Sequence, residues 1–293
     1  MIGADTTRVL APAAPRQESV FRRRLRRYLL PTIGLGVLAM WALIIAIGPA
    51  LAPFDPNAVE LGDRLLAPSS LHPFGTDALG RDVFSRVLYG ARLSLPTGLV
   101  VVLVAVVIGT AWGGIAAYAG GRVEEGLMRI ADVVLAFPAL ILAMAIAAAL
   151  GIGVVNAILA MVAVWWPAYA RLARGLVLVQ RDQEYVQAAR VLGYSPARIL
   201  GRHILPNATG PLIVLMTLDV GNAIITFAGL SFLGLGVTPP TAEWGAMITV
   251  GRLLIAQRWV ATFPGLAIIS VVLGFNFLGD GIRDWLDPHA RRR

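Results

Sequence analysis

Few residues of this 293-residue chain have the type and spacing needed to do chemistry on a bound molecule. All 25 basic side chains are arginines, which excludes the lysine-bearing phosphate loop and lysine-based covalent chemistry, so any ATP must be bound by another chain. The absence of cysteine excludes disulfides, thiolate nucleophiles and iron–sulfur ligation. His72, His203 and His289 lie far apart, unlike the ligands of a metal motif. The sequence therefore predicts no catalytic residue, metal site or cofactor on this chain.

Polar residues inside apolar runs are the remaining candidates. Asp219 and Asn222 lie in an apolar run, and intramembrane acids mark either a transport path or a bond between helices. Both interpretations stay open for Asp219. Asp132, near the start of another apolar run, has a simpler explanation as the partner of Arg129 at i, i+3. The motifs H-E-x-x-H and G-x-S-x-G are absent, which argues against an intramembrane enzyme.

The elements that must position these residues are membrane helices. The chain is 57% hydrophobic and 14% charged, with a mean hydropathy of +0.74, whereas soluble domains carry about 25% charged residues. A membrane-spanning helix needs about 20 mostly apolar residues. Six runs meet this condition and predict an all-α membrane protein with six transmembrane helices, at Pro31 to Ala52, Leu93 to Ala119, Leu127 to Leu150, Val154 to Ala170, Pro211 to Leu235 and Trp259 to Leu278.

The distribution of arginine predicts how the spans are oriented. If both termini are cytoplasmic, 19 of the 25 arginines lie on the inner side and 6 on the outer side. The arginine run at 22–27 then anchors the first span, which is favoured over a nucleic-acid site. The predicted organisation is a cytoplasmic arm at 1–30, a six-span domain at 31–279 and a cytoplasmic tail at 280–293.

The first outer segment, at 53–92, is predicted to be periplasmic or extracellular. Within it, Asp77 is expected to cap a helix, with Asp82 and Arg86 paired at i, i+4. The expected apolar face of this helix comprises Val83, Phe84, Val87 and Leu88.

A polar segment at 171–207 joins the fourth and fifth spans and is too long for a simple turn. Gly193 predicts the end of one helix, and Ser195 before a proline predicts the start of a second, which is expected to stop at Pro206. The residues alone leave open a solvated basic loop or a docking element for a soluble subunit. An apolar stripe on the first helix is predicted from Tyr185, Ala188, Ala189 and Leu192.

The same segment resembles the cytoplasmic signature of the inner-membrane permeases of bacterial ABC importers. That signature reads E-A-A, three residues, G, nine residues and I-x-L-P. At the same spacing this chain has Gln187-Ala188-Ala189, Gly193 and His203-Ile204-Leu205-Pro206. Gln187 replaces the usual Glu and His203 the usual Ile, while Glu184 lies one turn earlier on the same face.

Further motifs narrow the resemblance to the dipeptide/oligopeptide/nickel permease branch, over roughly Thr32 to His289. Phe227 departs from that pattern, because Glu often stands at this position. The matching stretches include His72-Pro73-Phe74-Gly75-Thr76-Asp77, Gly80-Arg81-Asp82, Arg202-His203-Ile204-Leu205-Pro206-Asn207, Leu230-Ser231-Phe232-Leu233-Gly234-Leu235-Gly236, Pro239-Pro240, Trp244-Gly245 and Gly279-Asp280-Gly281-Ile282-Arg283-Asp284.

The resemblance implies a type I importer fold in a bacterial inner membrane. The expected partners are a second homologous permease, two ATP-binding subunits or one fused subunit, and an extracytoplasmic solute-binding protein. ATP and Mg²⁺ would be held by the partner subunits. The residues expected at the ATPase interface are Glu184, Gln187, Ala188, Ala189, Gly193 and Ser195.

Peptides are the solute class that the resemblance favours, with Asp219 and Asn222 as candidates for the translocation path. Nickel or another small solute is the first alternative. A self-sufficient secondary transporter is a weaker one, because the chain has no clear internal repeat and the long elbow would serve no obvious purpose there.

Overall fold

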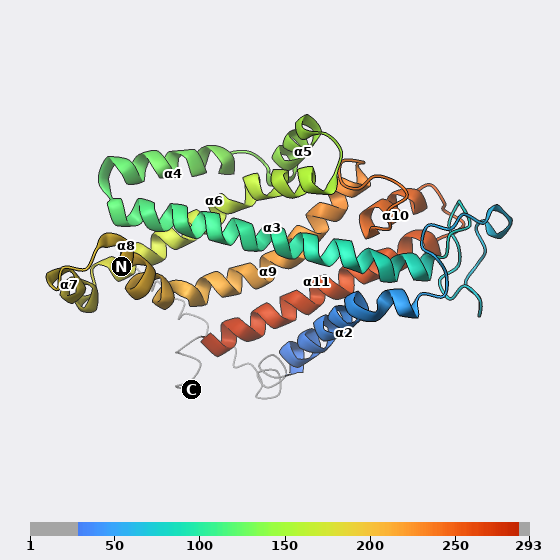
Figure 1. The fold of residues 1–293 in the computed structure, drawn as a ribbon, viewed down its shortest axis with the longest axis horizontal. Coiled ribbons are helices and arrows are strands. Elements are labelled where there is room, and N and C mark those ends of the chain that lie inside the picture. Colours follow the sequence, from blue (N-terminus) through green and yellow to red (C-terminus); the bar gives the residue numbers. More distant parts are fainter. Residues whose placement is uncertain (1–28, 287–293) are drawn as a thin grey trace, which may run out of the picture.

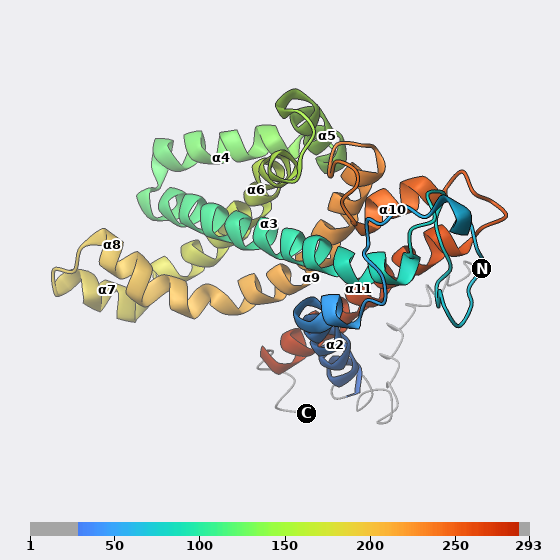
Figure 2. The same cartoon turned by 45° about the vertical axis from the view of Figure 1, so that its right-hand side comes forward.

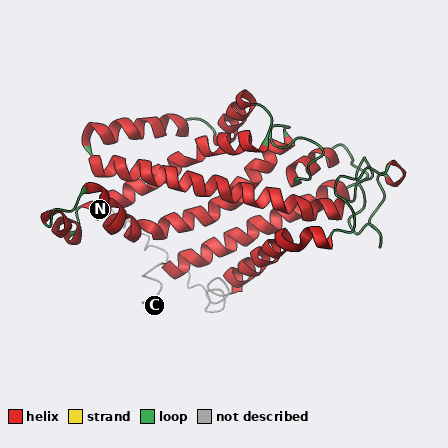
Figure 3. Cartoon of the chain, viewed as in Figure 1, coloured by secondary structure: helices red, strands yellow, loops and turns green. Residues whose placement is uncertain are grey.

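The regular elements of the protein are helices. The computed structural model describes residues 29–286, and within that range the chain forms helices and loops without a strand (Figure 3). Five helices are long and apolar enough to cross a membrane. They are α2 (Leu30–Leu51), α3 (Val83–Ala119), α6 (Val154–Arg181), the helix Pro196–Phe232 that contains α9 (Leu205–Phe232), and α11 (Trp259–Leu286).

The predicted third span is not one continuous helix. It is divided into α4 (Gly121–Leu135) and α5 (Ala139–Leu150), which are bent by 89° and make a sixth span only if the pair is counted as one. Pro138 explains the break, because proline lacks an N–H donor and holds its neighbour out of the helical region. Figure 1 shows α4 running along α3 while α5 turns away.

Other boundaries also differ from the predicted ones. The helix α3 begins at Val83 and is capped by Asp82, not Asp77, because the Asp82 carboxylate accepts the Ser85 N–H at 2.7 Å. Both α6 and α11 continue past the predicted ends of their apolar runs, since helix formation does not require apolar residues at each position. Nearly all of the predicted arm at 1–30, and residues 287–293 of the tail, lie outside the described residues.

The long helix α3 packs against α2, α4, α6 and α9, while α11 packs against α2 and α9 (Figures 1 and 2). Two glycines allow α3 and α6 to approach closely. A Cβ atom at Gly109 would lie 2.3 Å from the Trp166 carbonyl oxygen, and one at Gly113 would lie 1.9 Å from that of Ala170. Larger side chains would force these helices apart.

The bundle has two distinct ends (Figure 1). The loop end contains the irregular segment 52–82, with the short 3-10 helix η2 (Leu61–Asp63), and α10 (Trp244–Gly251), which the sequence did not predict. The elbow end contains α7 (Glu184–Val191), α8 (Pro196–Ile199) and the π-helical turn η3 (Leu200–Ile204). The polar segment expected between the fourth and fifth spans therefore forms its own small helical unit.

Buried charges tie the loop end together. Asp77 pairs with Arg81 at 2.7 Å, and Asp82 pairs with His72 at 3.0 Å. The expected pair of Asp82 with Arg86 is therefore wrong. Arg86 instead lies 3.9 Å from the Asp77 carboxylate and donates to the carbonyls of Pro56 and Pro240 at 2.6 and 3.3 Å.

Candidate functional site

The inner face of the elbow is an apolar contact with the bundle. Val186 and Ala189 of α7 are buried with Ile199 and Ile204, against Ala117 of α3 and Val177 of α6. Arg181, the last residue of α6, also donates to the Ala117 carbonyl at 2.8 Å. These contacts fix the elbow to two long helices.

The outer face of the elbow carries five of the six residues predicted for the ATPase interface. Glu184, Gln187, Ala188, Gly193 and Ser195 are exposed, whereas Ala189 is 4% exposed and packs on the inner face. The predicted stripe is therefore not the packed one, because Tyr185, Ala188 and Leu192 face outward. The most exposed apolar side chains of the elbow are Val191 and Leu192, at 88% and 71%.

Gly193 forms the sharp turn between α7 and α8. Its φ is +78°, and a Cβ there would meet no heavy atom within 4 Å. Glycine is thus favoured by the backbone conformation and not by crowding. The next helix begins with Pro196 at its first position, as predicted, and Ser195 at its N-cap has no side-chain capping bond.

The second helix of the elbow does not stop at Pro206, contrary to the prediction. It passes through the π turn η3 and continues into α9 with Pro206 in the first turn. A π turn widens the backbone and offers one way to place a proline ring without ending the helix. The elbow is consequently continuous with the membrane helix that follows it.

Asp219 and Asn222 come together on one side of α9. Asp219 is half-buried, and its Oδ1 lies 3.4 Å from Asn222 Nδ2. The other carboxylate oxygen accepts a hydrogen bond from the Tyr169 hydroxyl of α6 at 2.8 Å. Asn222 is exposed, and Thr226 continues the polar stripe one turn further. Tyr169 was missed from the sequence, although a buried tyrosine hydroxyl usually needs a partner.

Asp132 does not pair with Arg129, as the sequence suggested. It pairs with Arg171 of α6 at 2.7 Å, because α4 lies beside α6 and brings the two side chains together. Glu124 of α4 likewise pairs with Arg174 of α6 at 2.6 Å. These pairs join two neighbouring helices.

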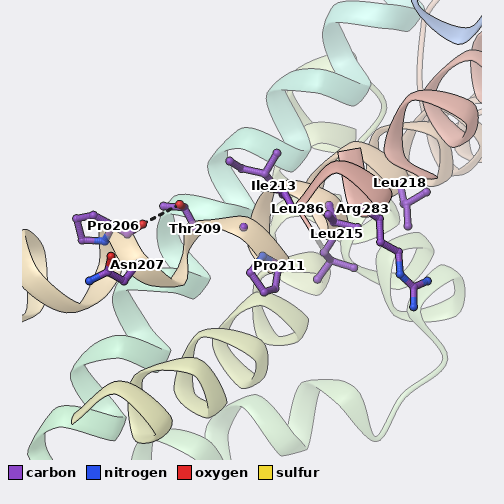
Figure 4. Close-up of a pocket in the computed structure, with 11 residues that line it drawn as sticks. Pro206, Asn207, Thr209, Pro211, Ile213, Leu215, Leu218, Arg283 and Leu286 are labelled. Atoms are coloured by element: carbon purple, nitrogen blue, oxygen red, sulfur yellow. Dashed lines mark hydrogen bonds between the residues drawn. The ribbon is translucent and has the colours of Figure 1, made fainter. Parts of the chain in front are cut away.

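A cavity of about 730 Å³ lies where α9 leaves the elbow, beside the end of α11 (Figure 4). Arg283 is the charged residue in its lining. Leu218 also lines the cavity and is followed in the chain by Asp219. The cavity is lined by Pro206, Asn207, Thr209, Gly210, Pro211, Ile213, Val214, Leu215, Leu218, Arg283 and Leu286.

The comparisons with known proteins identify the family of this bundle. Residues 105–292 match the family described as "Binding-protein-dependent transport system inner membrane component". The chain belongs to this family. It is therefore a multi-pass permease subunit of an ABC importer, and the predicted fold class and permease branch are confirmed.

Similar curated proteins are permeases of the same branch. The probable D,D-dipeptide transport system permease protein of Escherichia coli strain K12 is 49% identical over 87% of this chain and 86% of its own length. The dipeptide transport system permease protein of Alkalihalophilus pseudofirmus is 43% identical over 92% of this chain and 89% of its own. The glutathione transport system permease protein of Pectobacterium atrosepticum is 46% identical over 92% and 90%.

The solved structure of the MetNI methionine ABC transporter in an inward-facing conformation shares the fold. The TM-score is 0.57 at 18% identity, and the match covers 69% of this chain and 96% of that one.

Proposed function

We propose that this chain forms one half of the path through which an ATP-driven importer moves peptides. A second homologous permease completes the path, two ATP-binding subunits or one fused subunit hold ATP and Mg²⁺, and a solute-binding protein delivers the peptide. The peptide class is supported by similar permeases whose names refer to dipeptides, D,D-dipeptides and glutathione.

The observation that carries this proposal is the exposed outer face of the elbow. Val191 and Leu192 hold their apolar side chains away from the bundle, beside the turn at Gly193. Exposed apolar side chains that cluster on a protein surface mark interaction sites. We assign this face to the ATP-binding subunits, which places the elbow end and both termini in the cytoplasm, in agreement with the arginine distribution.

Movement of the elbow is the step that couples ATP to transport. Its inner face is packed on α3 and α6, and its second helix continues into α9, so a displacement of the docked subunit is transmitted to three long helices. Alternation between inward-open and outward-open packings follows if ATP binding favours one of them.

The polar stripe of Asp219, Asn222 and Thr226 is the candidate wall of the path. In a membrane helix such residues face a polar cavity or another chain, not lipid. The cavity beside Arg283 lies on the elbow side of this stripe and would form the cytoplasmic mouth of the path.

The test is purification of the tagged chain from its native membrane under gentle conditions, with identification of the co-purifying chains. We expect a second six-span permease and P-loop subunits with vanadate-sensitive ATPase activity. Reconstituted with its binding protein, the complex should take up labelled alanyl-alanine. Uptake of Ni²⁺ in place of the dipeptide would replace the peptide assignment with the nickel alternative. Recovery of the chain alone, without ATPase activity, would favour a secondary transporter.

A further inference from the structure

Among residues 29–286, one side-chain hydrogen bond joins the two membrane helices that enter and leave the elbow. The Tyr169 hydroxyl of α6 donates to Oδ2 of Asp219 in α9 at 2.8 Å, across 50 residues of sequence. At 1.5 Å per residue, Tyr169 lies about 18 Å before the end of α6 at Arg181, and Asp219 lies about 21 Å beyond the start of α9 at Leu205. The bond therefore crosses the helical hairpin at similar heights on both arms.

The Tyr169 side chain is held in place by α3. It is 0% exposed, and the glycine at position 109 lets α3 approach its Cβ so closely that a methyl group there would lie 2.5 Å away. Because it is buried between helices, Tyr169 has no access to a solute in the path. Its hydroxyl group therefore acts on the path through the bond to Asp219.

The hairpin is thus tied at two levels. At the elbow, Val186, Ala189, Ile199 and Ile204 pack on α3 and α6. Further into the membrane helices, the bond from Tyr169 holds α9 against α6. An arm tied at two separated points cannot pivot freely about either of them.

We propose that the bond between Tyr169 and Asp219 is a latch that makes α6, the elbow and α9 move as one rigid body during transport. Asp219 is then a positioning residue whose function requires its bond to Tyr169. This inference rests on the proposed function, since it concerns how motion of the docked elbow reaches the path.

The latch and a path-lining carboxylate make opposite demands on two conservative variants. Tyr169→Phe removes the bond but keeps the carboxyl group of Asp219. Asp219→Asn removes the carboxyl group but keeps an oxygen that accepts from Tyr169. Thr217→Val is the matched control, because the buried Thr217 hydroxyl bonds at 2.8 Å to the Ile213 carbonyl within α9 and joins no second helix.

Distances between the helices test the latch without reference to the solute. The chain has no cysteine, so cysteines placed at the exposed residues Leu159 of α6 and Ile225 of α9 carry the only nitroxide labels on this subunit. Both sites lie on the loop-end side of the bond. The distance distribution is measured by pulsed electron double resonance in the full complex, with and without ATP and vanadate.

We expect one narrow distance in the wild type, unchanged by nucleotide. Tyr169→Phe should broaden it, most of all with ATP and vanadate, whereas Asp219→Asn should broaden it less and Thr217→Val not at all. An unchanged distribution in Tyr169→Phe overturns the latch. Because no solute is added, this result stands even if the wild type fails to transport alanyl-alanine.

Measurements of uptake distinguish the latch from a role of the Asp219 carboxyl in the path that does not need Tyr169. If the latch acts in coupling, Tyr169→Phe lowers the number of alanyl-alanine molecules taken up per ATP hydrolysed by about five-fold, the factor that corresponds to one lost hydrogen bond, and Asp219→Asn lowers it less. Normal coupling in Tyr169→Phe with abolished uptake in Asp219→Asn would show that Asp219 acts in the path without its bond to Tyr169, and would overturn the proposal.

Discussion

The carboxylate of Glu243 accepts a hydrogen bond from the Ser94 hydroxyl at 3.1 Å and so joins the start of α10 to the loop-end half of α3. The same oxygen accepts the Gly245 N–H at 3.0 Å, and the other accepts the Ala246 N–H at 2.9 Å. Glu243 is fully buried. One side chain therefore caps a helix and connects it to another.

Removal of this cap should destabilise the protein. Glu243→Ala leaves two backbone N–H groups and the Ser94 hydroxyl without their acceptor in a buried site, and we expect a loss of about 2–4 kcal/mol. Glu243→Gln should cost less than Glu243→Ala, because its amide oxygen still accepts one backbone N–H and its amide nitrogen can donate to the Ser94 oxygen, whereas the second backbone N–H loses its acceptor. Thermal unfolding of the purified protein checks both. Glu60→Ala at an exposed site is the control, and equal losses in Glu60→Ala and Glu243→Ala would contradict the assignment.

Glu243 also predicts a dependence of stability on pH. Burial raises the pKa of this carboxyl, although its N–H donors act in the opposite direction. The folded protein therefore keeps the proton to higher pH than the unfolded chain does. The stabilisation is complete below the ordinary pKa of glutamate and is lost as the pH rises through the raised folded value. Glu243→Gln should flatten this decline in melting temperature relative to the wild type, and an identical decline would exclude Glu243 as its source.

Arg92 compensates for a proline in α2. Pro49 has no N–H to donate to the Ile45 carbonyl, and Arg92 of α3 donates to that oxygen at 2.8 Å and to the Ala46 carbonyl at 3.2 Å. Arg92→Leu should cost about 1.5–3 kcal/mol, as expected for bonds from a charged donor. Pro49→Ala restores the N–H, so Arg92→Leu should cost less in that background. Additive losses in the double-mutant cycle would rule out the compensation.

Gly193→Ala tests the turn of the elbow. The substituted Cβ has open space but must adopt a positive φ, at a cost of about 1–2 kcal/mol. We expect lower uptake per ATP hydrolysed, because the strained turn alters how the outer face is presented. Gly201→Ala is the matched control, since that site is equally open and its φ is not positive. If both variants couple normally in the reconstituted complex, the turn is not part of the coupling device.

Leu192→Glu tests the docking surface itself. Burying a leucine against a partner contributes about 1.5–3 kcal/mol, so its replacement by a charge should weaken binding of the ATP-binding subunits by about ten-fold or more. Leu253→Glu alters a leucine that is 80% exposed between α10 and α11, at the loop end of the bundle, and should leave that binding unchanged. Recovery of ATP-binding subunits with each tagged variant measures the difference. Equal recovery with both would move the docking site away from Leu192.

The membrane helices could be predicted because long apolar runs have few alternatives to a membrane-spanning helix. The break at Pro138 was missed because apolar residues on both sides hid it. The helix α10 was missed because eight residues between glycines and prolines give too short a pattern. Apolar periodicity locates spans better than it locates interruptions.

The candidate site was only partly accessible from the sequence. The spacing of the elbow motif identified its turn and most of its exposed residues, but not that Val186 and Ala189 form the packed face. Periodicity shows which residues share a side of a helix and not which side meets the bundle. Tyr169 and Asp219 are separated by 50 residues, and no local pattern could have paired them.

The length of α3 gives the protein a mechanical property. Its 37 residues extend about 55 Å, whereas the hydrocarbon layer is about 30 Å thick. One helix thus contributes Arg86 to the buried charges of the loop end and Ala117 to the apolar contacts of the elbow. If it tilts as a rod, neither membrane surface can rearrange without the other. If binding at one surface changes the affinity at the opposite surface by some factor, binding at the opposite surface must change the affinity at the first by the same factor. Each side of the membrane therefore reports the occupancy of the other.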